Sequence, residues 1–177
     1  MAKMKRPRIF PDSYGYKLTR TGHLFRVVRA GSPRSHPSRG GTWYSVEIYP
    51  GYRPSYLRGQ GLRGVPGVGG KKLYRGVVRL HNPYFFEIPE VKAEGEIPIR
   101  LWEHVTGKRL TSYRGFYGRQ AEKYYAKLER EIAEILSSQG FDGVVLYYQP
   151  GGPHTRYPSQ LFVFSKNRLY NRPAWKH

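Results

Sequence analysis

Tyrosines and arginines alternate along two stretches of the chain and have the clearest chemical character in the sequence. The alternating residues are Tyr49, Tyr52, Arg53, Tyr56 and Arg58 in one stretch, and Tyr113, Arg114, Tyr117 and Arg119 in the other. A tyrosine ring stacks on a nucleobase with about 1–3 kcal/mol per base, while an arginine holds the adjacent phosphate. The pattern favours nucleic-acid binding, but its specificity is low because tyrosines also pack at the rim of a core with the hydroxyl in water.

The sequence lacks the motifs of several other binding and catalytic sites. A phosphate-binding loop is excluded in the glycine-rich stretch before Lys71, because Val65 stands where a glycine is required and Lys72 where Ser or Thr is required. The six histidines are scattered and the chain has no cysteine, so no metal site is predicted. A Gly-x-Ser-x-Gly elbow is absent. Four glutamates that could form acid pairs are expected to be solvated loop acids: Glu87, Glu90, Glu94 and Glu96.

The charge of the chain is large and unevenly distributed. Its 177 residues include 31 Lys and Arg against 12 Asp and Glu, a formal net charge of +19. Residues 1–80 hold 17 basic and two acidic residues, residues 81–142 hold nine and ten, and residues 143–177 hold five and none. Such a surface attracts polyanions, so the expected partner is nucleic acid or an acidic macromolecular target. The first half and the last strand region should form the surface that faces it.

Composition also limits the class and the compartment. The length suits one domain, and 38% hydrophobic residues suffice for a core. No apolar run approaches about 18 residues, so no membrane-spanning helix is predicted. The basic residues 1–8 lead into no apolar segment, which argues against a classical secretory signal. We therefore expect a cytoplasmic or virion-associated protein; the sequence does not indicate its oligomeric state.

The pattern of elements predicts a mostly β protein with one long helix. Strands are expected over residues 24–28, 42–49, 73–80, 84–88, 144–148 and 161–164, a short helix over 98–106, and a long helix over 119–138. A basic arm (1–20) would precede one domain (21–170), and a basic tail (171–177) would follow it. The glycine- and proline-rich segment 51–72 reads as a basic surface loop. Its basic residues are candidates for nucleic-acid binding: Arg53, Arg58, Arg63, Lys71 and Lys72.

Five short motifs occur in an order that is similar to the order of motifs in one known family. They are Phe25-Arg26-Val27, then Gly41-Thr42-Trp43-Tyr44-Ser45, a strand ending at Asn82-Pro83, then Gly140-Phe141-Asp142-Gly143-Val144, and Leu161-Phe162-Val163-Phe164-Ser165. Together they span roughly residues 22–170. This order resembles the ADP-ribosyltransferase superfamily, in particular its small phage- and toxin-associated branches with an Arg–Ser–Glu signature.

The resemblance implies a fold, an activity and a site. The fold would be an ADP-ribosyltransferase-like α+β fold with two packed, mostly antiparallel sheets and one long helix. The activity would be mono-ADP-ribosyl transfer from NAD, the substrate, to a macromolecular acceptor, without a metal. Arg26 would hold a phosphate or ribose of NAD, and Ser45 would brace the site. Tyr44 and Tyr56 would stack on the nicotinamide.

The sequence departs from the family pattern at the catalytic glutamate, where it has Gln160. No Asp or Glu follows Asp142. A carboxylate opposite the oxocarbenium-like transition state is worth roughly 4 kcal/mol at about 4 Å, or about three decades of rate. Gln160 can hydrogen-bond a ribose hydroxyl but cannot supply that charge. Glu47 lies two residues after Ser45, on the same strand face, and could substitute as the acid or form an ion pair within the basic half.

Three functions therefore stay open at the level of the sequence. The first is a mono-ADP-ribosyltransferase. The second is a catalytically inactive member of the fold that binds nucleic acid in a phage virion or a nucleoprotein complex. The third, an RNA-binding protein of ribosomal type, would explain the charge but not the order of the motifs.

Overall fold

The computed structural model describes residues 14–30, 40–52, 73–88, 96–110, 119–148 and 157–165. Within these ranges the chain forms seven strands and two helices. The strands are β1 (Tyr16–Thr19), β2 (Gly22–Ala30), β3 (Gly41–Val46), β4 (Leu73–Leu80), β5 (Pro83–Glu87), β6 (Gly143–Tyr148) and β7 (Tyr157–Phe164), and the helices are α2 (Glu96–Thr106) and α3 (Arg119–Ser138). The predicted α+β class is confirmed.

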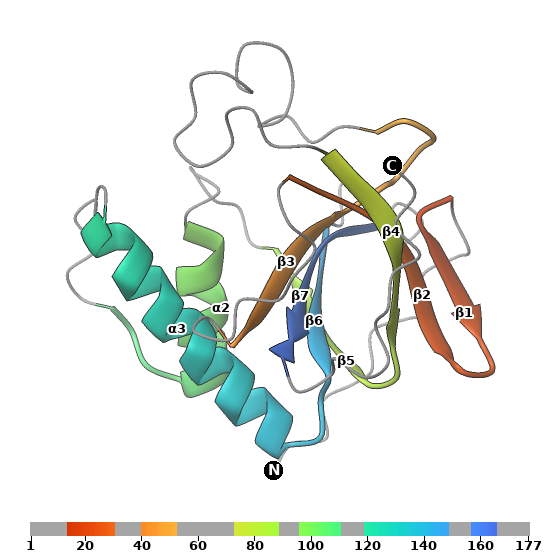
Figure 1. Cartoon of the computed structure of the whole chain (residues 1–177). Helices are drawn as coiled ribbons and strands as arrows, with labels where there is room; N and C mark the ends of the chain where they lie inside the picture. The colour runs from red at the N-terminus through yellow and green to blue at the C-terminus, as the bar shows by residue number, and fades with distance from the viewer. Residues whose placement is uncertain are drawn as a thin grey trace.

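All seven strands belong to one curled sheet in the order β1-β2-β3-β7-β6-β5, with β4 paired to β2 (Figure 1). Every pairing is antiparallel except that of β5 with β6. The prediction of two packed sheets is therefore wrong for the described residues: a single sheet curls, so that its two ends face each other. The predicted short helix over residues 98–106 is confirmed as α2, which begins two residues earlier and packs against α3.

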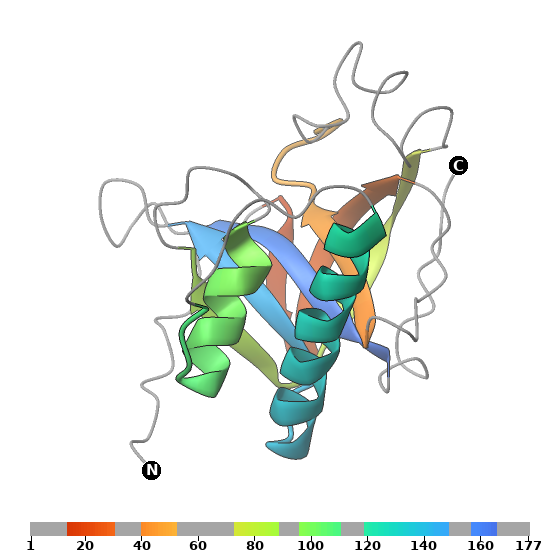
Figure 2. The ribbon, with the colours of Figure 1, turned by 90° about the vertical axis from the view of Figure 1, so that its left-hand side faces the viewer.

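The curled sheet has an inner face and an outer face, each with its own hydrophobic cluster. The inner cluster lies within the curl and joins β1, β2 and β4 to β3, β6 and β7 through residues such as Phe25, Leu80 and Leu161. The outer cluster lies between the sheet and the two helices, which lie side by side across it (Figure 2). Trp43 of β3 stacks on Phe162 of β7 in this layer, with ring centroids 4.8 Å apart.

Helix α3 forms as its sequence predicts. Leu128, Ile132 and Leu136 recur at intervals of four residues, and all three are buried against the outer cluster. Gly140 follows the helix with φ of +89°, a conformation that favours glycine and ends the helix. The predicted boundaries of this helix and of β4 are confirmed.

Strand β2 changes neighbours on one of its edges, and the change occurs at Arg26. Residues 22–25 pair with β1, whereas residues 27 and 28 pair with β3 on the same edge. The backbone N–H of Arg26 donates to the carbonyl of Gly15 (3.0 Å), and its carbonyl accepts from the N–H of Glu47 (2.8 Å). A side chain on Gly15 would lie only 2.6 Å from the Glu47 carbonyl oxygen, so glycine lets the three segments meet.

The predicted arm, loop and tail have different outcomes. The expected arm over residues 1–20 is wrong for Tyr16–Thr19, which form β1 and place the Tyr16 side chain in the inner cluster. The predicted basic loop (51–72) is described only at Gly51 and Tyr52, and the predicted tail (171–177) lies outside the described residues.

Candidate functional site

Arg26, Ser45 and Gln160 lie on three neighbouring strands, β2, β3 and β7. Ser45 is directly opposite Gln160 on one side and Val28 on the other. Directly opposite residues share a face, and residues two apart on a strand also share a face. Arg26, two residues before Val28, therefore lies on the same outer face as Ser45 and Gln160. The sheet brings together three predicted site residues that are far apart in the sequence.

The three side chains differ in how far they reach solvent. Ser45 is buried, Gln160 is half-buried and Arg26 is exposed. The Nη1 of Arg26 donates to the hydroxyl of Tyr14 (2.8 Å), and its guanidinium lies 4.8 Å from the centre of the Tyr14 ring. This contact orients the guanidinium at the surface. Because it engages only Nη1, Arg26 can still offer its remaining donors to an anionic ligand.

Glu47, the predicted substitute acid, is held in a buried ion pair. Its Oε2 lies 3.1 Å from Nη1 of Arg75, which comes from β4, and its Oε1 accepts from the backbone N–H of Gly51 (3.3 Å). Arg75 also reaches the carbonyl of Tyr52 through Nη2 (3.4 Å). Of the two interpretations that the sequence left open for Glu47, the ion pair is the one that the structure contains. It ties the start of β4 to the segment that follows β3.

Tyr44, predicted to stack on nicotinamide, is not brought to Arg26 and Ser45. It precedes Ser45 on β3, so its side chain points to the opposite face and is buried in the inner cluster. Its ring lies 5.9 Å from the guanidinium carbon of Arg29. Burial raises the pKa of Tyr44 above its ordinary value of 10.0, and the charge and hydrogen bond of Arg29 act in the opposite direction.

The motif around Asp142 has a local structural role. Asp142 accepts backbone hydrogen bonds from His81 (2.5 Å) and Asn82 (3.1 Å). Asn82 in turn donates from its side chain to the carbonyl of Gly140 (3.0 Å). These bonds join the turn before β5 to the turn before β6, as expected for a carboxylate that caps a turn rather than one that catalyses a reaction.

Six predicted binding residues lie outside the described part of the chain: Tyr56, Arg53, Arg58, Arg63, Lys71 and Lys72. Within the described residues, no group of three or more His, Asp or Glu side chains could hold a metal. Neither of the two described helices is long and apolar enough to cross a membrane.

Two residues of this region were missed in the sequence analysis. Tyr14 fell within the expected arm, although the short Tyr-Gly-Tyr stretch around it is a signal of extended structure. Arg75 was part of a predicted strand, but no local pattern pairs it with Glu47, which is 28 positions earlier.

The arrangement supplies hydrogen-bond donors on one face of the sheet, and the described strands that carry it contribute no carboxylate besides Glu47. Glu47 is the only acid in the described β2, β3 and β7 and residues 47–52, and Arg75 neutralises it. The site can therefore hold anionic and hydroxyl groups through Arg26, Ser45 and Gln160. Comparison with known proteins yields no match of this chain to any family model, curated protein or solved structure.

Proposed function

We propose that this chain is an ADP-ribosyltransferase-like protein that binds NAD across Arg26, Ser45 and Gln160 and transfers its ADP-ribose to a macromolecule. One observation carries the proposal: these three residues, chosen from their motifs, share one face of three adjacent strands. Unrelated motifs in a curled sheet of seven strands would have no reason to fall on neighbouring strands with matching faces. The resemblance in motif order thus gains support from the strand order.

Each residue has a definite task in this proposal. The exposed guanidinium of Arg26 binds a phosphate oxygen of NAD through charge-assisted hydrogen bonds. Ser45 hydrogen-bonds from the floor of the site, and the Gln160 amide binds a ribose hydroxyl beside it. The bond between ribose and nicotinamide breaks, nicotinamide leaves with the bonding electrons, and a nucleophile of the acceptor attacks the ribose carbon. Without a carboxylate beside the sugar, the transfer is slow.

The alternative is an inactive member of the fold that keeps the surface for binding nucleic acid. One observation favours it: Glu47 is engaged by Arg75, so Gln160 has no free acid next to it within the described strands. The excess positive charge of the chain then serves a polyanion rather than a reaction.

A thermal-shift titration with NAD tests the binding step. We expect NAD to raise the melting temperature of the full chain, because a ligand that binds only the folded state stabilises it. Arg26→Ala should lose this shift. Arg109→Ala is the matched control, since Arg109 is also exposed but follows α2, and it should keep the shift. If the unmodified chain shows no shift and transfers no label from NAD, the enzyme proposal is rejected.

A further inference from the structure

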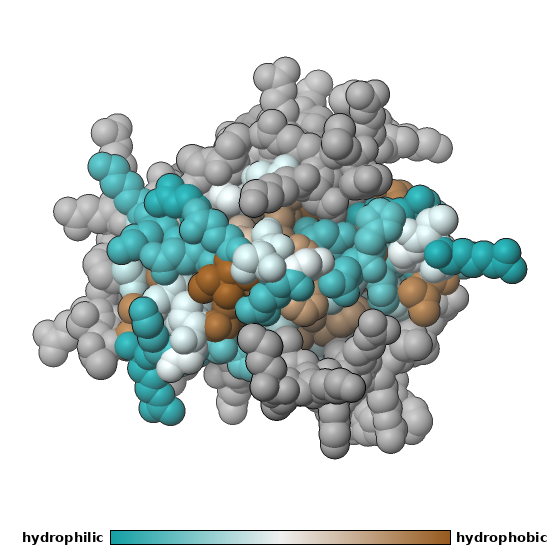
Figure 3. Space-filling model, turned by 90° about the horizontal axis from the view of Figure 1, so that it is seen from below, coloured by the Kyte–Doolittle hydropathy of each residue, from teal (hydrophilic) through white to brown (hydrophobic). Residues whose placement is uncertain are grey.

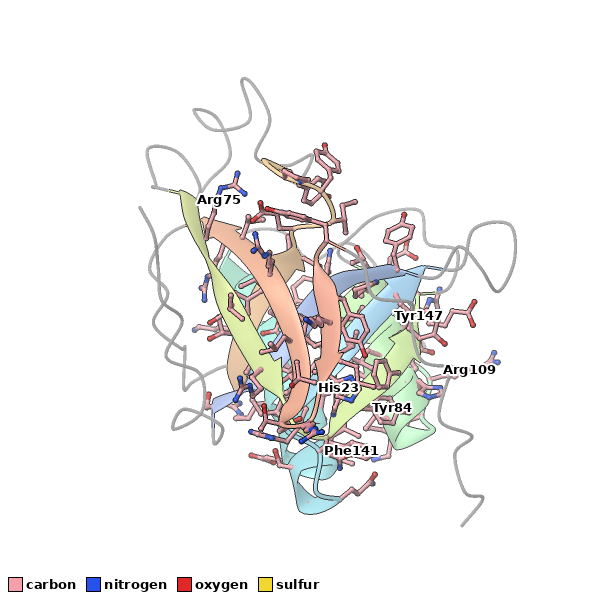
Figure 4. All side chains as sticks on the ribbon, turned by 90° about the vertical axis from the view of Figure 1, so that its right-hand side faces the viewer. His23, Arg75, Tyr84, Arg109, Phe141 and Tyr147 are labelled. Atoms are coloured by element: carbon pink, nitrogen blue, oxygen red, sulfur yellow. The ribbon has the colours of Figure 1, made fainter. Side chains whose placement is uncertain are left out.

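The outer face of β1, β2 and β4 lies on the side of the molecule opposite the helices (Figure 4). On these strands, Phe25, Val27, Val78 and Leu80 point into the inner cluster. The alternate side chains point outward and form two rows across the three strands. Leu24 is directly opposite both Lys17 and Arg79, and Arg26 is directly opposite Val77. We call this surface the strand platform: Tyr14, Lys17, Leu24, Arg26, Val77 and Arg79.

The strand platform is strongly positive. Lys17, Arg26 and Arg79 belong to it, and the exposed Arg20 lies in the adjoining turn between β1 and β2. Residues 14–30 and 73–80 contain no Asp or Glu. Seen from below, hydrophilic side chains lie beside hydrophobic ones at the end of the molecule where this hairpin lies, and hydrophilic side chains also lie at the opposite end (Figure 3). Cations gathered on strands that contribute no acid create a positive field, so the platform is complementary to a polyanion.

Apolar groups lie between these cations. Tyr14 is 40% exposed and Val77 is 43% exposed, both large fractions for hydrophobic side chains on a sheet. Leu24, half-buried, separates Lys17 from Arg79 in the first row. The Tyr14 ring already holds one planar cation, Arg26, at 4.8 Å. A ligand that fits must therefore bring both negative charge and flat apolar surface.

We propose that the strand platform docks single-stranded nucleic acid. Its phosphates would lie on the cations, and its unpaired bases would contact Tyr14, Val77 and Leu24. A duplex satisfies only the cations, because its bases face each other. Arg26 belongs both to the platform and to the candidate NAD site, so a docked strand would end beside that site. The docked strand could then be the acceptor of ADP-ribose. This role of the strand rests on the proposed function, whereas docking itself does not require NAD.

The first experiment locates the binding by charge removal on the full chain. A labelled oligo-dT strand is titrated at several salt concentrations against Lys17→Gln/Arg20→Gln and against the control pair Lys108→Gln/Arg109→Gln. Both pairs remove two exposed cations, so the total charge is matched. Each lost phosphate contact lowers the slope of log affinity against log salt by about 0.7, so Lys17→Gln/Arg20→Gln should lower it by about 1.4. The control pair should leave the slope unchanged. Equal effects of the two pairs would overturn the proposal.

The second experiment separates single strands from other polyanions. Tyr14→Leu loses both the stacking ring and the contact that orients Arg26, so it should weaken oligo-dT binding by about tenfold more than it weakens duplex binding. Tyr14→Phe keeps the ring and loses only the hydroxyl that accepts from Arg26, so it should keep the preference for oligo-dT over duplex that Tyr14→Leu loses. Equal loss with strand and duplex, or competition by poly-glutamate as effective as that by oligo-dT, would show that the platform binds charge alone and would overturn the assignment. The readout contains no NAD, so it fails or succeeds independently of the NAD titration.

Discussion

Helices cover one half of the outer face of this sheet, and no helix of the described residues covers the other half, which we call the bare half. Over β7 and β3 the outer face presents Phe162, Phe164 and Trp43, and helices α2 and α3 cover them. Over β1, β2 and β4 it presents Lys17, Arg26 and other members of the strand platform. Where large apolar side chains point outward, a helix buries them; where cations point outward, the strands stay open to a ligand. The covered half therefore contributes to stability, and the proposed binding is assigned to the other half of the same face.

The charges of the two halves follow the same division. The covering helices carry their own acids: Arg100 pairs with Glu96 (3.9 Å) and Glu103 (3.0 Å), and the Trp102 indole donates to Glu131 (2.7 Å). Residues 14–30 and 73–80, which carry the strand platform, contain no acid of their own. Ser45 and Gln160 lie on β3 and β7, the two central strands of the path β1-β2-β3-β7-β6-β5.

The largest expected effect breaks the covered half. Phe162→Ala removes a fully buried ring that stacks on Trp43, and we expect it to lower the free energy of unfolding by about 3–5 kcal/mol. Urea denaturation followed by circular dichroism measures this. A loss below about 1 kcal/mol would mean that the helices do not pack on this face as described.

A smaller loss of unfolding free energy is expected at the ion pair between Glu47 and Arg75. Glu47→Gln leaves Arg75 without its counter-charge, and since the Arg75 side chain is 32% exposed, we expect a loss of about 1–3 kcal/mol rather than the larger value of a fully buried pair. A double-mutant cycle with Arg75→Gln separates the pair from its parts. Additive losses would contradict a direct coupling of the two side chains.

A pH-dependent effect is expected from the inner cluster. Burial raises the pKa of Tyr44 in the folded chain above the unfolded value of 10.0. The stabilisation from the neutral phenol is therefore complete below pH 10 and is lost as the pH rises through the folded pKa. Melting temperature against pH, from about 9 to 11, should fall less steeply for Tyr44→Phe than for the unmodified chain. Parallel curves would contradict the burial of this hydroxyl.

The smallest effect is expected on the bare half. Val77→Ala removes an exposed side chain from the strand platform and should change the free energy of unfolding by no more than about 0.5 kcal/mol. The same denaturation experiment compares it with Phe162→Ala. A loss as large as that of Phe162→Ala would show that Val77 is covered and that the two halves do not differ.

Local patterns were sufficient for most elements of the fold. The apolar stripe of α3 and the β-branched run of β4 give their bounds directly, since each depends on residues near in sequence. The four-residue β1, with its Lys17 and exposed Leu18, has too little apolar pattern to be recognised, and it is defined by pairing with β2. The curl into one sheet likewise depends on contacts between distant strands, which no local pattern encodes.

The candidate site was predictable in part. Alternation along β3 already places Tyr44 and Ser45 on opposite faces, so both could not serve one ligand. The adjacency of β2, β3 and β7 required the structure, because Gln160 comes more than a hundred residues after Ser45. The partner of Glu47 could not be named from the sequence, since many arginines of the basic half were available.

The central claim is that Arg26, Ser45 and Gln160 form an NAD site that lacks only its carboxylate. Gln160→Glu supplies that carboxylate beside Ser45, and release of nicotinamide from NAD is the readout. We expect the rate to rise by about three decades over the unmodified chain, since one such charge is worth roughly 4 kcal/mol at about 4 Å. Arg26→Ala in the same background should remove the gain. A folded Gln160→Glu chain that releases nicotinamide no faster than the unmodified chain would contradict the account.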